Sequence, residues 1–342
     1  MPFTKIALTM DEQPLTSPAD GPEPRTLTDR WAPSNTLLLD GPLERRSLRS
    51  ATFNFVMGLL ALGGAFLVFQ VLVSPLLLVI QIGLSEGGMA SLETIGNPDQ
   101  LLASYTRELI ISNSAGQLIG LALPALLMAR LHTNGVSGYL RLRGVDLRLL
   151  LLAIVGVLGM QPVVQWLAQL NQNLPLPESV RLFEQTQLEL IRSVLDSGLG
   201  VAFNLSMLAL VPGLCEELLF RGYAQRQFER AAGPAGGVLL SGVIFGAYHL
   251  RPSQLLPLVV LGIYLAYLTW RTGSLWPAIL VHIAHNGIAV VAARYAQSHP
   301  AYDLETLEQA SMPWYAVLLG FAIVGSVLYV FHPLARRVRD AP

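Results

Sequence analysis

The feature that most constrains this chain is a series of about eight long apolar segments, spread along almost its whole length. They cover roughly residues 53–81, 108–129, 149–170, 199–220, 236–250, 254–270, 275–294 and 314–332. A helix needs about 20 mostly apolar residues to cross a bilayer, so most of these segments are long enough. Only 13% of the 342 residues are charged, against roughly 25% in soluble domains. The sequence therefore predicts an all-α fold, a polytopic bundle of about eight transmembrane helices.

The remaining segments divide the chain into four parts. Residues 1–48 are polar, charged and rich in proline, which predicts a disordered cytoplasmic tail. Residues 49–198 supply the N-terminal transmembrane helices and their loops, with a surface helix expected around 180–195. Residues 199–295 contain the polar motifs discussed below. Residues 296–342 supply a last loop, a final transmembrane helix and a basic C-terminal tail.

The arginines of the loops predict the orientation in the membrane, because cytoplasmic loops carry an excess of basic residues. On one side of the predicted bundle lie Arg45, Arg46, Arg49, Arg130, Arg141, Arg143, Arg148, Arg226, Arg230, Arg271, Arg336, Arg337 and Arg339. On the other side lie Arg107, Arg181, Arg192, Arg251 and Arg294, together with many of the acidic residues. We therefore expect both termini in the cytoplasm of a multi-pass protein of the plasma membrane. The net charge of -1 gives no argument for binding nucleic acid, and the sequence does not fix the oligomeric state.

A first polar motif interrupts the fourth apolar segment. Glu216 and Glu217 follow an apolar run, and Arg221 lies four residues after Glu217. Residues four apart are neighbours on a helix, so Glu217 and Arg221 can pair. Glu216 lies about 100° around the helix and is left for another partner. Pro212, which has no amide hydrogen to donate, should bend the helix just before the glutamates. A charge cluster at the membrane interface would give the same local pattern.

A second motif lies in the fifth segment, where Phe245 and His249 share one helical face. Gly242 and Gly246 form a stripe of small residues that lets another helix approach closely. The fifth segment is short, with Arg251 and Pro252 soon after the histidine. A helix that ends inside the bilayer has to line a wet cavity or be buried in protein. We therefore expect a cavity around His249.

A third motif lies in the seventh segment, where His282 and Asn286 share a face and His285 lies between them. Each of the three motifs by itself also has a non-catalytic explanation, namely a charge cluster at the interface for the first and hydrogen-bonded packing for the other two. Together they are more informative, because rises of ~1.5 Å per residue bring Glu216, His249 and His282 to similar depths in the bundle. A glutamate beside histidines can take a proton from water, and an asparagine amide can donate to an oxyanion.

In order and spacing these residues resemble the CPBP family, which includes the type II CAAX prenyl endopeptidases. The pattern of that family is Glu-Glu-x-x-x-Arg, then Phe-x-x-x-His, then His-x-x-x-Asn. Here it is present as Glu216 and Glu217 with Arg221, Phe245 with His249, and His282 with Asn286. The resemblance covers about residues 199–295. It implies an intramembrane protease, with a membrane protein or a lipidated peptide as its substrate.

The resemblance also implies a role for each residue. Glu216 would activate water beside His249, and Glu217 would support the site or share the proton. His282 and Asn286 would stabilise the oxyanion, while Arg221, Phe245 and His285 would support the others. Two histidines and a glutamate are also a zinc ligand set, so we expect any divalent metal of the site to be zinc, held by Glu216, His249 and His282.

Three functional hypotheses follow from the sequence. The leading one is an endopeptidase that hydrolyses peptide bonds within the bilayer, with access from the cytoplasmic side. The second is a proton-coupled transporter, because chains of buried glutamates and histidines also relay protons. The third is a non-enzymatic membrane scaffold or immunity protein.

Overall fold

The computed structural model describes residues 26–28, 36–44, 50–85, 93, 95–172, 174–196, 198–298 and 311–340. Its first half contains β1 (Thr26–Thr28), β2 (Thr36–Leu38), α1 (Ala51–Phe66), η1 (Leu67–Val73), α2 (Ser74–Gly83), α3 (Pro98–Gln117), η3 (Leu118–Ala122), α4 (Leu123–His132), α5 (Val136–Tyr139) and α6 (Leu147–Gln172). Its second half contains α7 (Glu178–Asp196), α8 (Val201–Leu205), η4 (Ser206–Leu210), α9 (Val211–Glu217), η5 (Leu218–Ala224), α10 (Gln225–Tyr248), η6 (Pro252–Gln254), α11 (Leu255–Thr272), α12 (Trp276–Ser298) and α14 (Trp314–Asp340). The predicted polytopic helical bundle is confirmed.

Seven helical stretches of the described chain are long and apolar enough to cross a membrane. One of them, Val201–Tyr248, has 48 residues and would measure about 70 Å if it were straight. It reverses direction at Gly233, whose positive φ of 74° is strained for any residue with a side chain. This stretch therefore supplies two of the eight apolar segments predicted from the sequence.

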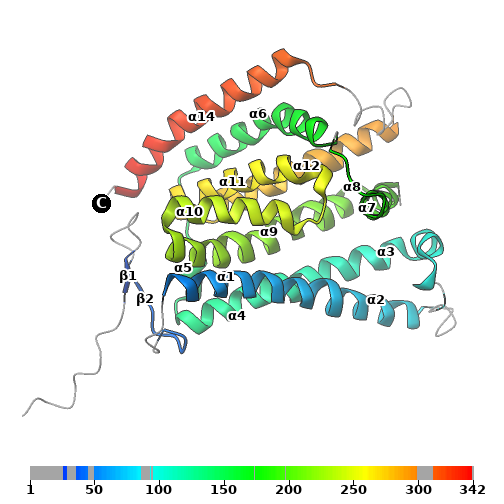
Figure 1. The fold of residues 1–342 in the computed structure, drawn as a ribbon, viewed down its shortest axis with the longest axis horizontal. Coiled ribbons are helices and arrows are strands. Elements are labelled where there is room, and N and C mark those ends of the chain that lie inside the picture. The colour runs from blue at the N-terminus through cyan, green and yellow to red at the C-terminus, as the bar shows by residue number, and fades with distance from the viewer. Residues whose placement is uncertain are drawn as a thin grey trace, which may run out of the picture.

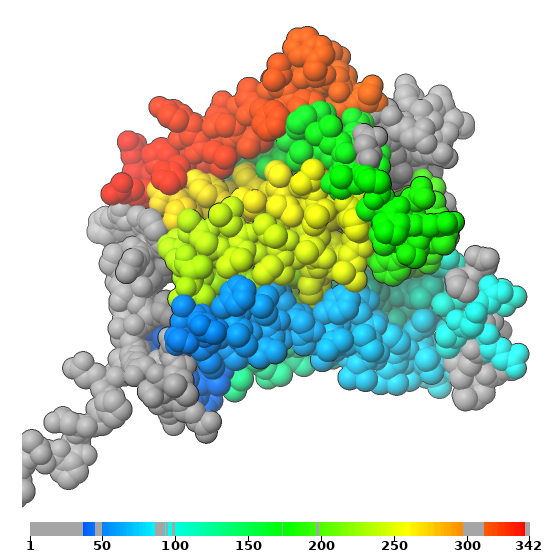
Figure 2. Space-filling view, in the orientation of Figure 1, coloured from blue at the N-terminus to red at the C-terminus, as the bar shows by residue number. Residues whose placement is uncertain are grey.

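The helices lie in three layers (Figure 1). The helices α1 to α4 form one layer, the helices α9 to α12 lie in the middle, and α6 and α14 form the opposite layer, as the coloured bands of Figure 2 also show. Two apolar cores follow this order, one uniting α1, α4, α9 and α10 and the other uniting α6, α11, α12 and α14. The middle layer therefore has protein on both sides, while apolar side chains such as Leu60 and Val71 are exposed on the outside, where lipid would lie.

Prolines explain most of the irregular turns within the long helices. Three of the four π-helical segments in the described residues end two residues before Pro75, Pro124 or Pro212. A proline has no amide hydrogen for the carbonyl four residues earlier, and a wider turn shifts the hydrogen-bond register around it. The fourth segment, η5, has no proline and follows directly on Glu217.

The predicted stripe of small residues on α10 does bring another helix close. A Cβ added to Gly242 would lie 2.6 Å from the backbone nitrogen of Ile263 on α11, and one added to Gly246 would lie 3.0 Å from that of Val259. The close approach of α10 and α11 therefore depends on these two glycines. It fixes the end of α10, where His249 caps the helix.

The prediction of a disordered tail over residues 1–48 is wrong for residues 36–44. The strands β1 and β2 pair in antiparallel fashion, and the backbone amides of Gly41 and Leu43 donate to the carbonyls of His132 and Leu131. Glu44 is 3% exposed. Residues 1–25, 29–35 and 45–48 lie outside the described residues. The segment 36–44 docks on the bundle through hydrogen bonds of polar residues. The hydrophobicity of the segment, on which the prediction was based, does not detect such bonds.

Candidate active site

Glu216 lies at the centre of the site, on the last turn of α9. Its side chain is 15% exposed, and its Oε2 atom lies 3.9 Å from Nε2 of His249 and 3.9 Å from Nε2 of His282. Within the described part of the chain, this buried oxygen has no hydrogen-bond partner. The structure therefore brings together a carboxylate and two imidazoles from three different helices, at separations too long for direct hydrogen bonds.

The end of α10 fixes the orientation of His249. Its Nδ1 atom lies 2.8 Å from the carbonyl oxygen of Phe245. A carbonyl oxygen can only accept, so Nδ1 carries a proton, and in its neutral form the ring presents the lone pair of Nε2 to Glu216. The ring of Phe245 stands edge-on to the imidazole, with centroids 4.7 Å apart. The predicted support of His249 by Phe245 thus comes from both its ring and its backbone.

Glu217 orients the second imidazole in the same way. Nδ1 of His282 lies 2.8 Å from Oε1 of Glu217, and a carboxylate at this distance accepts the Nδ1 proton. Nε2 of His282 is left facing Glu216, and it can accept a hydrogen bond in the neutral ring or donate one in the imidazolium that the Glu217 carboxylate stabilises. A carboxylate behind a histidine fixes both its tautomer and its ring plane, as in hydrolases that use an acid–histidine pair.

Arg221 neutralises the charge of Glu217. Its Nη1 donates to Oε1 of Glu217 at 2.6 Å, and both side chains are 0% exposed. This is the pair predicted from the spacing of four residues. Nη2 donates to the carbonyl of Gly262 on α11, and the guanidinium lies 4.2 Å from the centre of the Phe245 ring. Arg221 is thus held by α11, by Phe245 and by Glu217, and it does not reach Glu216 through any hydrogen bond that the structure describes.

Asn286 joins α12 to the bend before Glu216. Its Nδ2 donates to the carbonyl of Leu208 at 3.2 Å. In regular α-helical register this carbonyl would accept from residue 212, which is a proline and has no amide hydrogen. The asparagine amide has a second hydrogen, and the residue lines the cavity described next. The other predicted residue on this helix, His285, lies 3.3 Å from Nε2 of Gln161 on α6.

The predicted cavity around His249 is present, with a volume of about 760 Å³. It is lined by Glu216, His249, His282, His285 and Asn286, and by residues of α6, α7 and the segment after α10. The sequence analysis missed the contribution of α6, which includes Gln161 and Gln165. The sequence did contain a signal for this contribution, because these glutamines lie in an apolar segment and polar residues in such segments usually face the interior of the bundle.

The donor atoms have the chemistry of a zinc site but not its spacing. Two bare imidazole nitrogens and one carboxylate oxygen face one another, and the opposite nitrogen of each ring is held as in many zinc proteins. Ligand atoms around tetrahedral zinc lie only about 3.3 Å apart, given bonds of about 2.0–2.1 Å. Among the residues that the structure describes, no three acidic, histidine or cysteine side chains are placed to bind one metal ion. The expected metal set of Glu216, His249 and His282 does not fit in this arrangement.

Comparison with known proteins agrees with the resemblance noted in the sequence. Residues 198–288 match the family described as type II CAAX prenyl endopeptidase Rce1-like. The matched region begins just before α8 and ends within α12, so it contains Glu216, His249, His282 and Asn286. No curated protein and no solved structure matches the chain.

Proposed function

Because residues 198–288 form a domain of the Rce1-like type II CAAX prenyl endopeptidase family, we propose that the protein is an intramembrane endopeptidase. It hydrolyses peptide bonds of membrane-associated or lipidated proteins. The observation that carries this proposal is the gap between Oε2 of Glu216 and the Nε2 atoms of His249 and His282, 3.9 Å in each case. A water molecule about 2.8 Å from both atoms of such a pair would see them at an angle of about 90°, which its hydrogen-bond geometry accommodates.

In the proposed reaction Glu216 is the general base. Its carboxylate takes one proton from this water while the oxygen attacks the carbonyl carbon of the substrate, which forms a tetrahedral intermediate. His249 accepts the second hydrogen of the water on Nε2 and so orients the nucleophile. When the C–N bond breaks, Glu216 returns its proton to the leaving amine. The products are a carboxylic acid, which keeps the second hydrogen of the water, and an amine, which takes up that proton to give a carboxylate and an ammonium group. The site is then restored.

In this scheme His282 and Asn286 stabilise the negative charge on the oxygen of the intermediate. The Glu217 carboxylate holds Nδ1–H of His282, which favours a proton on Nε2 and allows that nitrogen to donate to the oxyanion. The second amide hydrogen of Asn286 donates to the same oxygen. Glu217 and Arg221 are positioning residues in this scheme, because Glu217 acts through His282 and Arg221 acts through Glu217. His285 and Gln161 line the space where the substrate lies.

Zinc enters no step of this proposal, because the spacing of the donors does not fit a zinc ion. Sensitivity to chelators distinguishes this proposal from the alternative, in which Glu216, His249 and His282 bind a metal ion. We expect cleavage to persist in 1,10-phenanthroline. Loss of cleavage that added zinc restores, together with one zinc per chain by mass spectrometry, would establish the metal site instead.

We also propose that both termini lie in the cytoplasm and that the protein resides in the plasma membrane. Seven stretches of the described chain are long and apolar enough to cross a membrane, and the reversal at Gly233 divides one of them in two. The resulting even number of crossings agrees with termini on the same side. The arginine-rich loops lie at the end of the bundle that holds α5 and the C-terminus (Figure 1). The excess of basic residues supports the assignment of this end to the cytoplasm.

The catalytic proposal is tested by comparing variants in native membranes. Cells that lack the protein are complemented with the wild type or a variant, and new peptide N-termini in their membranes are identified by amine labelling and mass spectrometry. We expect termini that Glu216→Gln and His249→Ala abolish. Glu189→Gln, which removes an exposed carboxylate on α7, is the matched control and should leave them unchanged. The same termini with the Glu216→Gln protein would refute the assignment.

A further inference from the structure

Apart from the candidate catalytic residues, the lining of the cavity comes mostly from one end of the bundle. The helix α6 contributes residues between Gln161 and Gln172, which form its C-terminal half. The helix α10 contributes its last turn, and α11 contributes Leu258 and Leu261 near its beginning. The segment between these two helices contributes Arg251, Ser253 and Gln254. All of these lie toward the end that is opposite to the C-terminus and to β1 and β2 (Figure 1).

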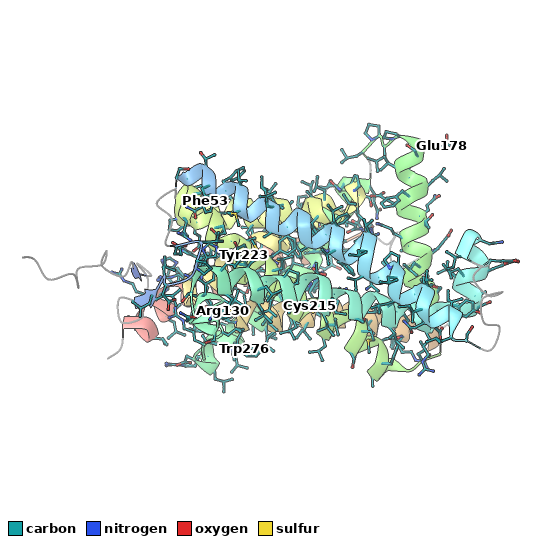
Figure 3. All side chains as sticks on the ribbon, turned by 90° about the horizontal axis from the view of Figure 1, so that it is seen from below. Phe53, Arg130, Glu178, Cys215, Tyr223 and Trp276 are labelled. Carbon is teal, nitrogen blue, oxygen red and sulfur yellow. The ribbon has the colours of Figure 1, made fainter. Side chains whose placement is uncertain are left out.

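The helix α7 frames the mouth of the cavity at this end. It runs across the long helices, so that Figure 1 shows it end-on and Figure 3 shows it lengthwise below the labelled Glu178. Its Arg181, Glu184 and Gln185 line the cavity. Oε1 of Glu184 accepts a hydrogen bond of 2.8 Å from the backbone amide of Ser253. The mouth is thus built from a helix that lies across the bundle end and a loop tied to it.

The opposite end of the site is sealed. Behind Glu216, the side chains of Arg221, Tyr223, Gln225, Gln227 and Phe228 are all 0% exposed. Nε2 of Gln225 donates to the carbonyl of Ala266 at 3.0 Å. These residues have no exposed surface, and none of them lines the cavity, so the cavity does not extend through this layer.

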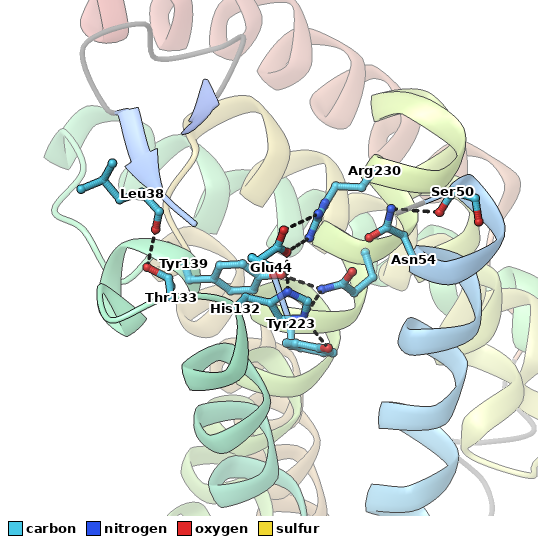
Figure 4. Close-up of polar contacts among 10 residues, drawn as sticks. Leu38, Glu44, Ser50, Asn54, His132, Thr133, Tyr139, Tyr223 and Arg230 are labelled. Carbon is cyan, nitrogen blue, oxygen red and sulfur yellow. Dashed lines mark hydrogen bonds and ion pairs between the residues drawn. The ribbon is translucent and has the colours of Figure 1, made fainter. Parts of the chain in front are cut away.

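A second polar layer lies at the same end, closer to β2 (Figure 4). His132 lies at its centre, with Nδ1 at 2.7 Å from Oε1 of Glu44 and Nε2 at 3.0 Å from the hydroxyl of Tyr223. Nη1 of Arg230 donates to Oε1 of Glu44 at 2.9 Å. Nε2 of Gln227 donates to the hydroxyl of Tyr139 at 2.6 Å. The docked segment 36–44 therefore belongs, through Glu44, to a hydrogen-bonded layer that lies between the site and this end of the bundle.

From this asymmetry we propose that the hydrolytic site takes its substrate from the extracytoplasmic side of the membrane. The inference rests on the proposed function and on the orientation given by the loop arginines, which places the sealed end in the cytoplasm. It replaces the cytoplasmic access expected from the sequence. The substrate is then an extended segment of an exported or membrane-anchored polypeptide, and a lipidated cytoplasmic tail is the alternative that the test must detect.

The chemistry of the lining suits an extended polypeptide. Gln161, Gln165 and Gln172 line the cavity from the same helix, between the catalytic end and the mouth. A carboxamide can both donate and accept hydrogen bonds, as the backbone of an unpaired strand requires inside a membrane. Val164 and Ala168 lie among them on α6 and receive apolar side chains.

The side of access can be measured with single cysteines. The natural Cys215 is 0% exposed, so the wild-type chain is a suitable background. Gln185→Cys places a thiol at the mouth, Gln165→Cys places one inside the cavity, and Ser137→Cys is the matched control on α5 at the sealed end. Intact spheroplasts are treated with a small, permanently charged thiosulfonate, and the thiols that remain are then counted in denatured protein with a maleimide polymer.

We expect both cavity cysteines to be modified in intact spheroplasts, and the control cysteine to be modified only after the membrane is opened. Modification of the control alone in intact spheroplasts would overturn the proposal, because the cavity would then face the cytoplasm. Protection of Gln165→Cys under both conditions would also overturn it, since no open path would reach the site.

These outcomes are independent of catalysis. Gln165→Cys should be modified equally in the Glu216→Gln protein, so a failure of the proposed hydrolysis would not disturb the labelling. The positions of the new N-termini then test the substrate class. Cleavage within extracytoplasmic segments supports the proposal, while cleavage confined to cytoplasmic tails contradicts it.

Discussion

Replacement of Arg221 by methionine should destabilise the protein strongly, because it leaves a buried carboxylate without its counter-charge. Both partners of the Arg221–Glu217 pair are 0% exposed, with 2.6 Å between Nη1 and Oε1. Removal of one partner of such a pair costs about 3–5 kcal/mol. A loss of this size lowers the melting temperature of a large domain by on the order of 10 °C.

The double variant Arg221→Met with Glu217→Gln distinguishes this cause from a simple loss of packing. It buries no charge, and the carboxamide oxygen of the new glutamine can still accept Nδ1–H of His282. We expect it to recover more than half of the lost stability, which thermal unfolding in nanodiscs followed by circular dichroism will measure. Arg148→Met, which removes an exposed arginine from its pair with Asp146, should melt like the wild type.

Two results would refute this reasoning. One is a single Arg221→Met variant that melts within about 2 °C of the wild type, since the buried charge would then be compensated in another way. The other is a double variant that melts below the single one, which would show that the guanidinium contributes through its other contacts. Those contacts are the carbonyl of Gly262 and the ring of Phe245.

The remaining predictions concern the docked N-terminal segment and the packing of α10. Burial raises the pKa of Glu44, but hydrogen bonds from His132 and Arg230 outweigh it and hold the pKa below its ordinary value of 4.5. The stabilisation from Glu44 is therefore complete above pH 4.5 and is lost as the pH falls through the lower pKa of the folded state. Hydrogen exchange over residues 36–44, corrected for intrinsic rates, should show this loss, and Glu44→Gln should remove the pH dependence. Gly242→Ala should destabilise the protein by about 1–3 kcal/mol, because its Cβ would meet the backbone of α11. Gly63→Ala, where nothing lies within 4 Å of the added Cβ, should not lower the melting temperature.

The sequence by itself determined the class of the protein and most of the residues to consider. The lengths of the apolar segments defined the membrane spans. The chain reverses at Gly233, where a segment that contains arginines is followed by an apolar one. Helical spacing alone predicted the pair of Glu217 and Arg221. Both inferences succeed because they depend on properties local to one helix, namely its composition and its repeat of 3.6 residues.

Only the tertiary structure decided how the motifs face one another. The spacing of Glu216 and Glu217 does not say which carboxylate holds His282 and which faces both imidazoles, because the rotation of a helix about its axis depends on its neighbours. That rotation is set by contacts such as Gly213 on Ile283 and by the bond from Asn286 to the carbonyl that Pro212 leaves. The open and sealed ends of the cavity also arise from α6, α7 and the docked segment 36–44. Their contribution was invisible in hydrophobicity, because it consists of hydrogen bonds between residues that are distant in the chain.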